Sequence, residues 1–276
     1  MAAGIPTIWL NFLAWLEANK DRLDLAKLKL KTVASGGAAP PRATIEKFRE
    51  LLGVFLLHAW GMTETSPIAT VCAPLAKHAD LSQAELVDMQ VKQGRQVYGI
   101  ELKCVGQDGR EAPHDGVSVG ELKVRGPWVI SGYFKGEGGK VVDDEGWLST
   151  GDVGTIDEDG YVQLTDRLKD VIKSGGEWIS SIEVENLAMS HPDVFEAAVI
   201  AVAHPVWQER PLLIVHPREG REPTKEAILA FLAARLPKWQ LPDDVAFVDG
   251  LPHTATGKLL KSELRQRFHG HLAVSA

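Results

Sequence analysis

The order of elements near the start of the chain is the feature that most constrains its fold. An alternating run at 28–33 leads directly into the small-residue loop Ser35-Gly36-Gly37-Ala38-Ala39-Pro40-Pro41. A helical period over 43–52 then ends at Gly53, and the wholly apolar run 54–57 follows. A strand, loop, helix and strand in this order predict parallel pairing in an α/β sheet, with the second strand covered on both faces.

The hydrophobic pattern changes twice after this α/β segment. From about residue 96 onwards, short alternating runs are separated by Asp-Gly turns, which is typical of a small antiparallel barrel or sheet. After Asp166, longer apolar runs alternate with helical stretches, the first of which opens with a capping-box pattern at Ser180. We therefore predict α/β plus α+β architecture: a domain over 1–166 with a small antiparallel β-barrel at about 95–166, then an α+β domain over 167–276.

Composition argues against several classes of function. The net charge of −7 provides no basic field for a polyanion, so no nucleic-acid partner is expected. Cys72 and Cys104 lack the spacing of a disulfide framework or a zinc site, which fits a reducing compartment. No apolar run approaches the ~20 residues of a membrane span, and no signal-peptide pattern opens the chain. We therefore expect a cytoplasmic protein without a transmembrane segment.

Two stretches of the first domain carry residue types suited to chemistry. The stretch from His58 to Pro67 follows the apolar run 54–57, at the strand end where open α/β sheets bind ligands. Its Trp60 can stack on a flat ring, and its Glu64 is a hard carboxylate suited to Mg²⁺. A loop with a core tryptophan and a surface glutamate is the alternative. In 146–154, glycines flank Asp152, which suits either a grip on vicinal ribose hydroxyls or an ordinary Asx-turn.

Two further stretches lie in the second domain. The charged, glycine-bearing run 166–179 straddles the predicted domain boundary, so it is either a hinge or a solvated linker. Lys258 lies in a glycine-containing loop before the last helix, where a lysine either reaches a phosphate or carboxylate or simply faces solvent. Lys261, a few residues later, is expected on the exposed face of that helix.

In this order, the four stretches resemble the C-terminal half of the adenylate-forming acyl-CoA synthetase superfamily. The similarity is greatest to the branch acting on medium- to long-chain fatty acids, and it covers essentially the whole chain. The run 166–179 and the element Thr256-Gly257-Lys258 are its most specific parts. The resemblance implies that 1–166 is the C-terminal part of the large AMP-binding domain and that 167–276 is a mobile C-terminal domain.

The resemblance also implies a reaction and its participants. A fatty acid and Mg·ATP form an acyl-adenylate with release of pyrophosphate, and the thiol of CoA then attacks the activated carbonyl. The expected cofactors and substrates are therefore ATP or AMP, Mg²⁺, CoA and a fatty acid, with no prosthetic group.

Individual residues take roles from the same resemblance. Lys258, Thr63 and Glu64 are the expected catalytic residues, and Glu64 is also the expected metal ligand. The expected nucleotide-binding residues are Gly36, Gly37, Ala38, Trp60, Gly61, Thr63, Asp152, Arg167 and Trp178. The expected CoA-binding residues are Ser174, Gly175 and Gly176, and the expected hinge is Lys169.

The chain departs from the family at its start. The Ser/Thr/Gly-rich phosphate loop with its lysine is absent, and residues 1–7 resemble a stretch midway through the large domain. We therefore expect a fragment, a split-gene product or a chain with a misassigned start, with a missing N-terminal half or a second copy as partner. Adenylation by the isolated chain is not expected. Two alternatives stay open: a non-catalytic remnant that binds a nucleotide or a partner, and the same fold acting on another acid or thiol acceptor.

Overall fold

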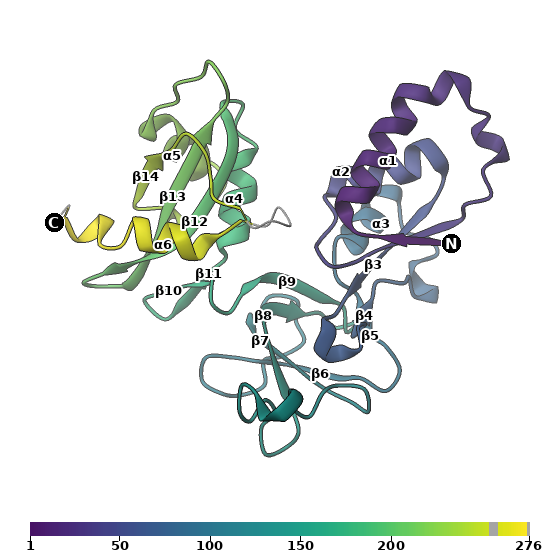
Figure 1. Cartoon of the computed structure of the whole chain (residues 1–276), viewed down its shortest axis with the longest axis horizontal. Coiled ribbons are helices and arrows are strands. Elements are labelled where there is room, and N and C mark those ends of the chain that lie inside the picture. The colour runs from purple at the N-terminus through teal and green to yellow at the C-terminus, as the bar shows by residue number, and fades with distance from the viewer. Residues whose placement is uncertain (254–258, 275–276) are drawn as a thin grey trace. The chain divides into compact units, whose positions relative to one another are not determined.

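The computed structural model describes residues 1–253 and 259–274, apart from the side chains of Ala26, Ala273 and Val274. The chain divides into two compact units, Met1–Leu164 and Thr165–Ala276, each of which contains its own sheets and helices (Figure 1). Within the described part of the chain, no helix is long and apolar enough to cross a membrane.

The first unit begins with a mixed five-stranded sheet in the order β1-β2-β3-β4-β5. Its strands are β1 (Ala2–Gly4), β2 (Thr32–Ser35), β3 (Phe55–Trp60), β4 (Thr70–Val71) and β5 (Arg95–Gln96). The first three strands are parallel to one another, which confirms the predicted α/β pattern. The strand predicted at 28–33 starts only at Thr32, and β3 alternates buried with half-buried side chains. The prediction that β3 is covered on both faces is therefore wrong, because one face of β3 is only partly covered.

Three helices accompany this sheet: α1 (Pro6–Asn19), α2 (Arg42–Leu52) and α3 (Gln83–Gln90). Trp9 of α1 and Phe48 of α2 pack edge to face at 5.5 Å in a core that also holds Val33 and Leu56 of the strands. Helix α2 ends at Gly53 in a left-handed conformation, as its sequence predicts.

Helix α3 was not among the predicted elements, although its N-terminal signal is present in the sequence. Ser82 Oγ accepts the Glu85 backbone N–H, and the Glu85 carboxylate accepts the Ser82 N–H. This reciprocal capping box satisfies two backbone donors at the helix start.

A four-stranded sheet completes the first unit. Its strands are β6 (Glu101–Val105), β7 (Gly120–Arg125), β8 (Leu148–Ile156) and β9 (Val162–Arg167), in the order β6-β7-β8-β9. The pairs β6/β7 and β7/β8 are antiparallel, as predicted for the small β unit. Most of the stretch 146–154, for which a ribose grip and an Asx-turn were both left open, forms β8.

Strand β8 contains a bulge. Glu121 of β7 pairs with Val153, whereas Lys123 pairs with Ser149, so β8 contains extra residues between these pairs. Gly151 lies in the bulge with a φ of 69°, a conformation that glycine adopts without strain.

The second unit is a sheet covered on both faces by helices. Its strands are β10 (Ile172–Ser174), β11 (Glu177–Ile179), β12 (Val194–His204), β13 (Gln208–Pro217) and β14 (Asp244–Phe247). Its helices are α4 (Ser181–Met189), α5 (Lys225–Ala233) and α6 (Lys261–Arg267). Four of the strands lie in the order β11-β10-β13-β12. The fifth strand, β14, lies outside this order and pairs in parallel with β13.

Two hydrophobic clusters hold this unit together. Val184 of α4 and Ile228 of α5 pack with Leu213 of β13, while Leu264 of α6 packs with Ile214 of the same strand. Because neighbouring residues of a strand point to opposite faces, α4 and α5 cover one face of the sheet and α6 covers the other. The α+β prediction for this half of the chain is confirmed, including the N-cap at Ser180, and Thr224 caps α5 in the same way.

Candidate functional site

The loop after β2 lies against the end of β3, at the carboxyl edge of the parallel strands. A Cβ atom added to Gly36 would lie 3.2 Å from the carbonyl oxygen of Ala59 in β3, so the loop and the strand are in close contact. A Cβ atom added to Gly61 would lie 2.0 Å from the carbonyl oxygen of Pro67, which excludes every other residue at this position. The structure therefore brings together the two glycine-bearing stretches that the sequence assigned to the nucleotide.

Trp60 and Asp152 connect the two sheets of the first unit. The Trp60 indole Nε1–H donates to Asp152 Oδ2 at 2.8 Å, and both residues are buried. Trp60 ends β3, and Asp152 lies in the bulge of β8, where the irregular backbone redirects its carboxylate. One carboxylate oxygen is therefore already held by the tryptophan, and the sequence did not indicate this pairing.

Glu64 lies on a short turn that follows β3. The turn is the 3-10 helix η3 (Thr63–Thr65), and the buried Thr65 hydroxyl accepts the Met62 N–H at 2.9 Å. Thr63 is exposed and Glu64 is half-buried. The Tyr133 hydroxyl donates to Glu64 Oε1 at 2.6 Å, and this hydrogen bond to a carboxylate raises the pKa of Tyr133.

This donor set fits a magnesium ion that is held mainly by a nucleotide. Among the residues that the structure describes, no three His, Cys, Asp or Glu side chains gather in a way that could hold a metal ion. Mg²⁺ commonly uses one or two protein carboxylates and takes its other ligands from water and substrate phosphates. A single half-buried carboxylate such as Glu64 meets that requirement.

Ser35 and His58 form a buried polar pair that was not among the predicted site residues. They are register partners: Ser35 is the last residue of β2, and His58 lies two residues before the end of β3. Ser35 Oγ and His58 Nδ1 are buried, and neither has a hydrogen-bond partner within the described residues. Burial lowers the pKa of His58 from its ordinary value of 6.5 to about 4. The available signal was a histidine on an otherwise apolar strand.

The predicted hinge region begins the second unit. Lys169 is exposed in the turn between β9 and β10, and its carbonyl accepts a hydrogen bond from Arg265 Nη2 at 3.1 Å. Arg265 also pairs with the carboxylate of Asp170. Arg167 is exposed at the end of β9, whereas Asp152 belongs to the first unit. Trp178 of β11 is half-buried, and its indole nitrogen is buried without a hydrogen-bond partner in the described chain.

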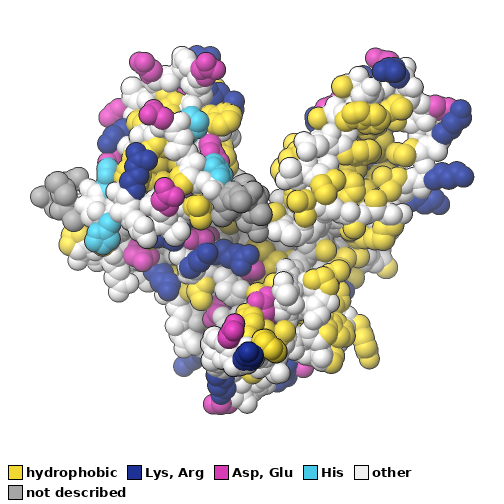
Figure 2. Space-filling model, viewed as in Figure 1, with side chains coloured by type: hydrophobic (Ala, Val, Ile, Leu, Met, Phe, Trp, Pro, Cys, Tyr) yellow, Lys and Arg dark blue, Asp and Glu magenta, His cyan; other side chains and the backbone are white. Residues whose placement is uncertain are grey.

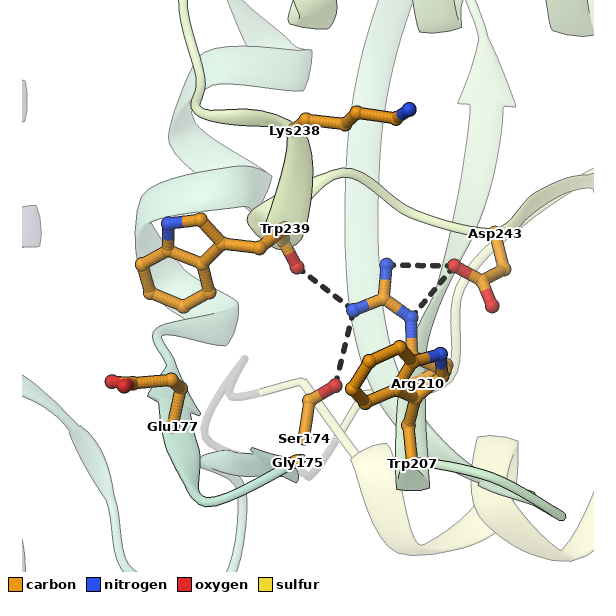
Figure 3. Close-up of a pocket in the computed structure, with 8 residues that line it drawn as sticks. All are labelled: Ser174, Gly175, Glu177, Trp207, Arg210, Lys238, Trp239 and Asp243. Atoms are coloured by element: carbon orange, nitrogen blue, oxygen red, sulfur yellow. Dashed lines mark hydrogen bonds and ion pairs between the residues drawn. The ribbon is translucent and has the colours of Figure 1, made fainter.

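Two of the three predicted CoA residues, Ser174 and Gly175, border a cavity of about 470 Å³ within the second unit, whereas Gly176 is not part of its lining (Figure 3). Gly175 and Gly176 form the two-residue turn between β10 and β11, with φ values of 59° and 91°. A turn with positive φ at both positions favours Gly-Gly. The cavity is lined by Ser174, Gly175, Glu177, Trp207, Arg210, Lys238, Trp239 and Asp243.

Arg210 lines this cavity, and hydrogen bonds fix the position of its side chain. Its guanidinium donates to Asp243 at 2.7 Å, to Ser174 Oγ at 3.0 Å and to the Trp239 carbonyl at 2.8 Å (Figure 3). Trp207 and Trp239 both line the cavity and remain about half exposed, at 50% and 44%. The two tryptophans and Lys238 were not predicted as site residues, because they lie far from the glycine turn in sequence.

Two lysines were predicted in the last loop and helix. Lys258 lies outside the described residues, so its assignment stays a prediction. Lys261 was expected to be exposed, and this is wrong: its ammonium lies 2.6 Å from Glu185 Oε1 and 2.6 Å from Ser181 Oγ. The sequence pattern of a short terminal helix did not show that its first residue faces the buried start of α4.

Comparison with known proteins identifies the family. The model of the AMP-binding enzyme family matches residues 1–134, and that of the AMP-binding enzyme C-terminal domain matches residues 183–258. The chain belongs to the AMP-binding enzyme family. The predicted resemblance is thereby confirmed.

Relatives in this family include several acid–CoA ligases. The chain is 49% identical over 268 residues to the 3-methylmercaptopropionyl-CoA ligase of Ruegeria lacuscaerulensis, with 97% of this chain and 49% of that protein covered. It is 45% identical to the medium-chain-fatty-acid–CoA ligase of Ectopseudomonas oleovorans, with 97% and 49% covered. The chain thus spans about half the length of these relatives.

Two solved structures that are 28% identical to the chain have a similar fold. The crystal structure of ATP-bound MatB from Rhodopseudomonas palustris matches with a TM-score of 0.77 at 28% identity, covering 97% of this chain and 51% of MatB. The o-succinylbenzoate CoA synthetase of Bacillus subtilis, in complex with its acyl-adenylate intermediate, matches with a TM-score of 0.75 at 28% identity, covering 95% and 50%.

Proposed function

We propose that this chain is the C-terminal half of an ATP-dependent acid–CoA ligase that acts on a fatty acid. The observation that carries the proposal is the convergence of Gly36, Trp60 and Asp152 at one edge of the first unit, with Glu64 on the following turn. Ligases with fatty-acid and related acid substrates among the relatives support the choice of substrate. The proposal includes a Mg²⁺ ion, a role in fatty-acid metabolism and a cytoplasmic location.

In the proposed reaction, the residues of the first unit hold the nucleotide. The Gly36-Gly37-Ala38 loop and the Trp60-Gly61 segment border the adenine, and Asp152 accepts hydrogen bonds from the ribose hydroxyls. Thr63 donates to a phosphate, and Glu64 binds the Mg²⁺ that neutralises phosphate charge. A carboxylate repels an attacking anion at its carbonyl carbon, so joining it to AMP makes it an electrophile with a good leaving group.

The second unit supplies the other half of the proposed chemistry. Arg167 binds the ribose, Trp178 lies beside the nucleotide, and Lys258 offsets the repulsion between the substrate carboxylate and the α-phosphate. Lys169 acts as the pivot that exchanges the adenylation and thioester-forming arrangements. This proposal treats 1–166 as part of the large domain and 167–276 as the mobile domain.

The cavity behind the Gly175-Gly176 turn suits one end of CoA. Its two half-exposed indoles offer flat apolar faces for the adenine ring, and Lys238 offers a positive charge to a phosphate. The charge of Arg210 is already matched by Asp243, so it keeps the cavity rigid rather than binding an anion. We propose that Ser174, Gly175 and Gly176 line the path of the pantetheine arm.

Binding measurements on the chain test both sites directly. AMP and CoA should each bind with a measurable enthalpy in a calorimetric titration. Asp152→Asn should weaken the binding of AMP about tenfold and leave the affinity for CoA unchanged, because one hydrogen bond to a charged group is lost. Trp207→Ala should weaken the binding of CoA and leave the affinity for AMP unchanged. If neither ligand bound, or if both variants lost both ligands equally, this assignment of the two sites would be wrong.

A second candidate is a non-catalytic chain that binds nucleotide or a partner. The chain spans about half the length of these relatives, so the test has to supply the other half. Fatty-acid-dependent exchange between ATP and pyrophosphate separates the two candidates when the chain is combined with the first half of a relative. Exchange supports the ligase, whereas AMP binding without exchange in that combination supports the binding protein.

A further inference from the structure

Three hydrogen bonds tie the loop after β7 to the turn that carries Glu64. The Ile130 N–H donates to the Glu64 carbonyl at 3.0 Å, and the Ser66 hydroxyl donates to the Trp128 carbonyl at 2.9 Å. The third bond is the one from Tyr133 to Glu64 Oε1 at 2.6 Å. The loop therefore holds both the backbone and the side chain of the same acidic residue.

Packing does not account for the position of the Tyr133 side chain. Tyr133 is 45% exposed, and the next residue, Phe134, is 79% exposed. The aromatic ring rests near Gly138, where an added Cβ atom would lie 3.4 Å from it. A half-exposed phenol contributes little core burial, so its defined interaction is the short hydrogen bond to the carboxylate.

We propose that Tyr133 is a positioning residue for Glu64 in the binding of Mg·ATP. Its hydroxyl holds Oε1, so that the free rotation of the carboxylate is lost and Oε2 is presented to the metal. This role rests on the proposed function, in which Glu64 binds Mg²⁺.

The chemistry of the Tyr133 phenol, which hydrogen-bonds the Glu64 carboxylate, supports this role. A lysine or arginine at the same place would neutralise the carboxylate and compete with the divalent cation. A phenol is neutral and donates a single hydrogen bond, so the carboxylate keeps its charge for the metal. A glutamate on an exposed turn otherwise loses rotamer entropy when it binds a cation, and a preformed hydrogen bond removes part of that cost.

Metal binding by the full chain tests the proposal with a readout other than activity. Mn²⁺ takes the place of Mg²⁺, and the enhancement of water-proton relaxation is followed as Mn²⁺ and ATP are added. Tyr133→Phe should weaken Mn²⁺ binding about fivefold, the loss expected for one hydrogen bond to a carboxylate. More Mn²⁺ should restore the wild-type enhancement, and the affinity for AMP without metal should be unchanged.

Matched variants separate the proposal from its premise. Tyr98→Phe removes a hydroxyl from a residue that is 98% exposed, and Ser66→Ala loosens the same loop without touching the carboxylate. Both should bind Mn²⁺ like the wild type, whereas Glu64→Gln should abolish the enhancement. If the wild type did not differ from a protein-free solution, or if Glu64→Gln gave the same enhancement as the wild type, the metal role of Glu64 would fail. If Glu64→Gln lost binding but Tyr133→Phe bound Mn²⁺ like the wild type, or if Ser66→Ala lost as much affinity as Tyr133→Phe, Tyr133 would not be a positioning residue.

Discussion

The ammonium group of Lys261, at the start of α6, lies 2.6 Å from Oε1 of Glu185 on α4, and only 11% and 10% of these side chains are exposed. Ser181 Oγ accepts a second hydrogen bond from the same ammonium at 2.6 Å, and the Val199 N–H donates to Glu185 Oε1 at 2.7 Å. Burial raises the pKa of Glu185, and the charge of Lys261 opposes that shift. The Lys261–Glu185 ion pair therefore holds the start of α6 against α4.

Removing Lys261 should therefore destabilise the second unit. Lys261→Ala leaves a buried carboxylate without its counter-charge, which typically costs about 3 kcal/mol or more. Urea unfolding followed by tryptophan fluorescence measures this loss. Lys225→Ala is the matched control, because its ion pair with Asp244 is more exposed and is worth less than about 1 kcal/mol. Equal losses in the two variants would show that the Lys261–Glu185 pair is not buried in solution.

The first unit should lose stability in mild acid because of His58. Its folded-state pKa of about 4 lies below the ordinary 6.5, so the unfolded chain takes up a proton first as the pH falls. The stabilisation is complete above pH 6.5 and is lost as the pH falls towards 4, by about 3 kcal/mol. His58→Asn should remove this part of the slope. Unfolding free energies measured at several pH values would contradict the prediction if wild type and variant fell in parallel.

The exposed apolar face of the first unit should make the chain associate. Figure 2 shows hydrophobic side chains gathered over the arm that contains α1 and β1, and β1 lies at one edge of its sheet. Ile8 and Trp15 of α1 are each 54% exposed. Exposed apolar patches and free strand edges favour self-association. Sedimentation velocity should show a concentration-dependent increase in mass that the double variant Ile8→Glu, Trp15→Glu reduces. A monomer at every concentration would rule this out.

Lys258 should act in adenylation alone. In a protein that also carries the first half of the fold, Lys258→Ala should slow acyl-adenylate formation about 10²-fold, since one contact to developing charge is worth about 3 kcal/mol. CoA attack on a supplied acyl-adenylate should be nearly unchanged. The two half-reactions are measured separately, with Lys225→Ala as the control. Equal loss of both half-reactions, or of neither, would overturn the assignment.

Lys169 should be needed as a pivot rather than as a charge. Lys169→Pro restricts φ to near −65° and should stop one half-reaction while the other survives. Lys169→Ala keeps the backbone free, and the Arg265 hydrogen bond is to the main-chain carbonyl, so this variant should retain both. Stopped-flow measurement of each half-reaction decides the matter, and a proline variant that retained both would exclude a hinge here.

Short-range signals in the sequence were sufficient for the architecture. The period of α2 with its stop at Gly53, the caps at Ser180 and Thr224, and the Gly175-Gly176 turn all depend on residues within a few positions of one another. Such signals act before any tertiary contact forms, so the α/β and α+β halves were predictable. The resemblance of four stretches to one family likewise required no coordinates.

Only the tertiary structure decided which side chains face one another across long separations. No local pattern links partners this far apart in sequence. Trp60 and Asp152 are separated by 92 positions, Glu64 and Tyr133 by 69, and Lys261 is similarly remote from Glu185. A charged residue at the start of a helix has the same local signal whether it faces water or a buried carboxylate. Burial is set by the packing of whole elements, so Lys261 and the cavity of Trp207 and Trp239 became visible only when the sheets and helices were assembled.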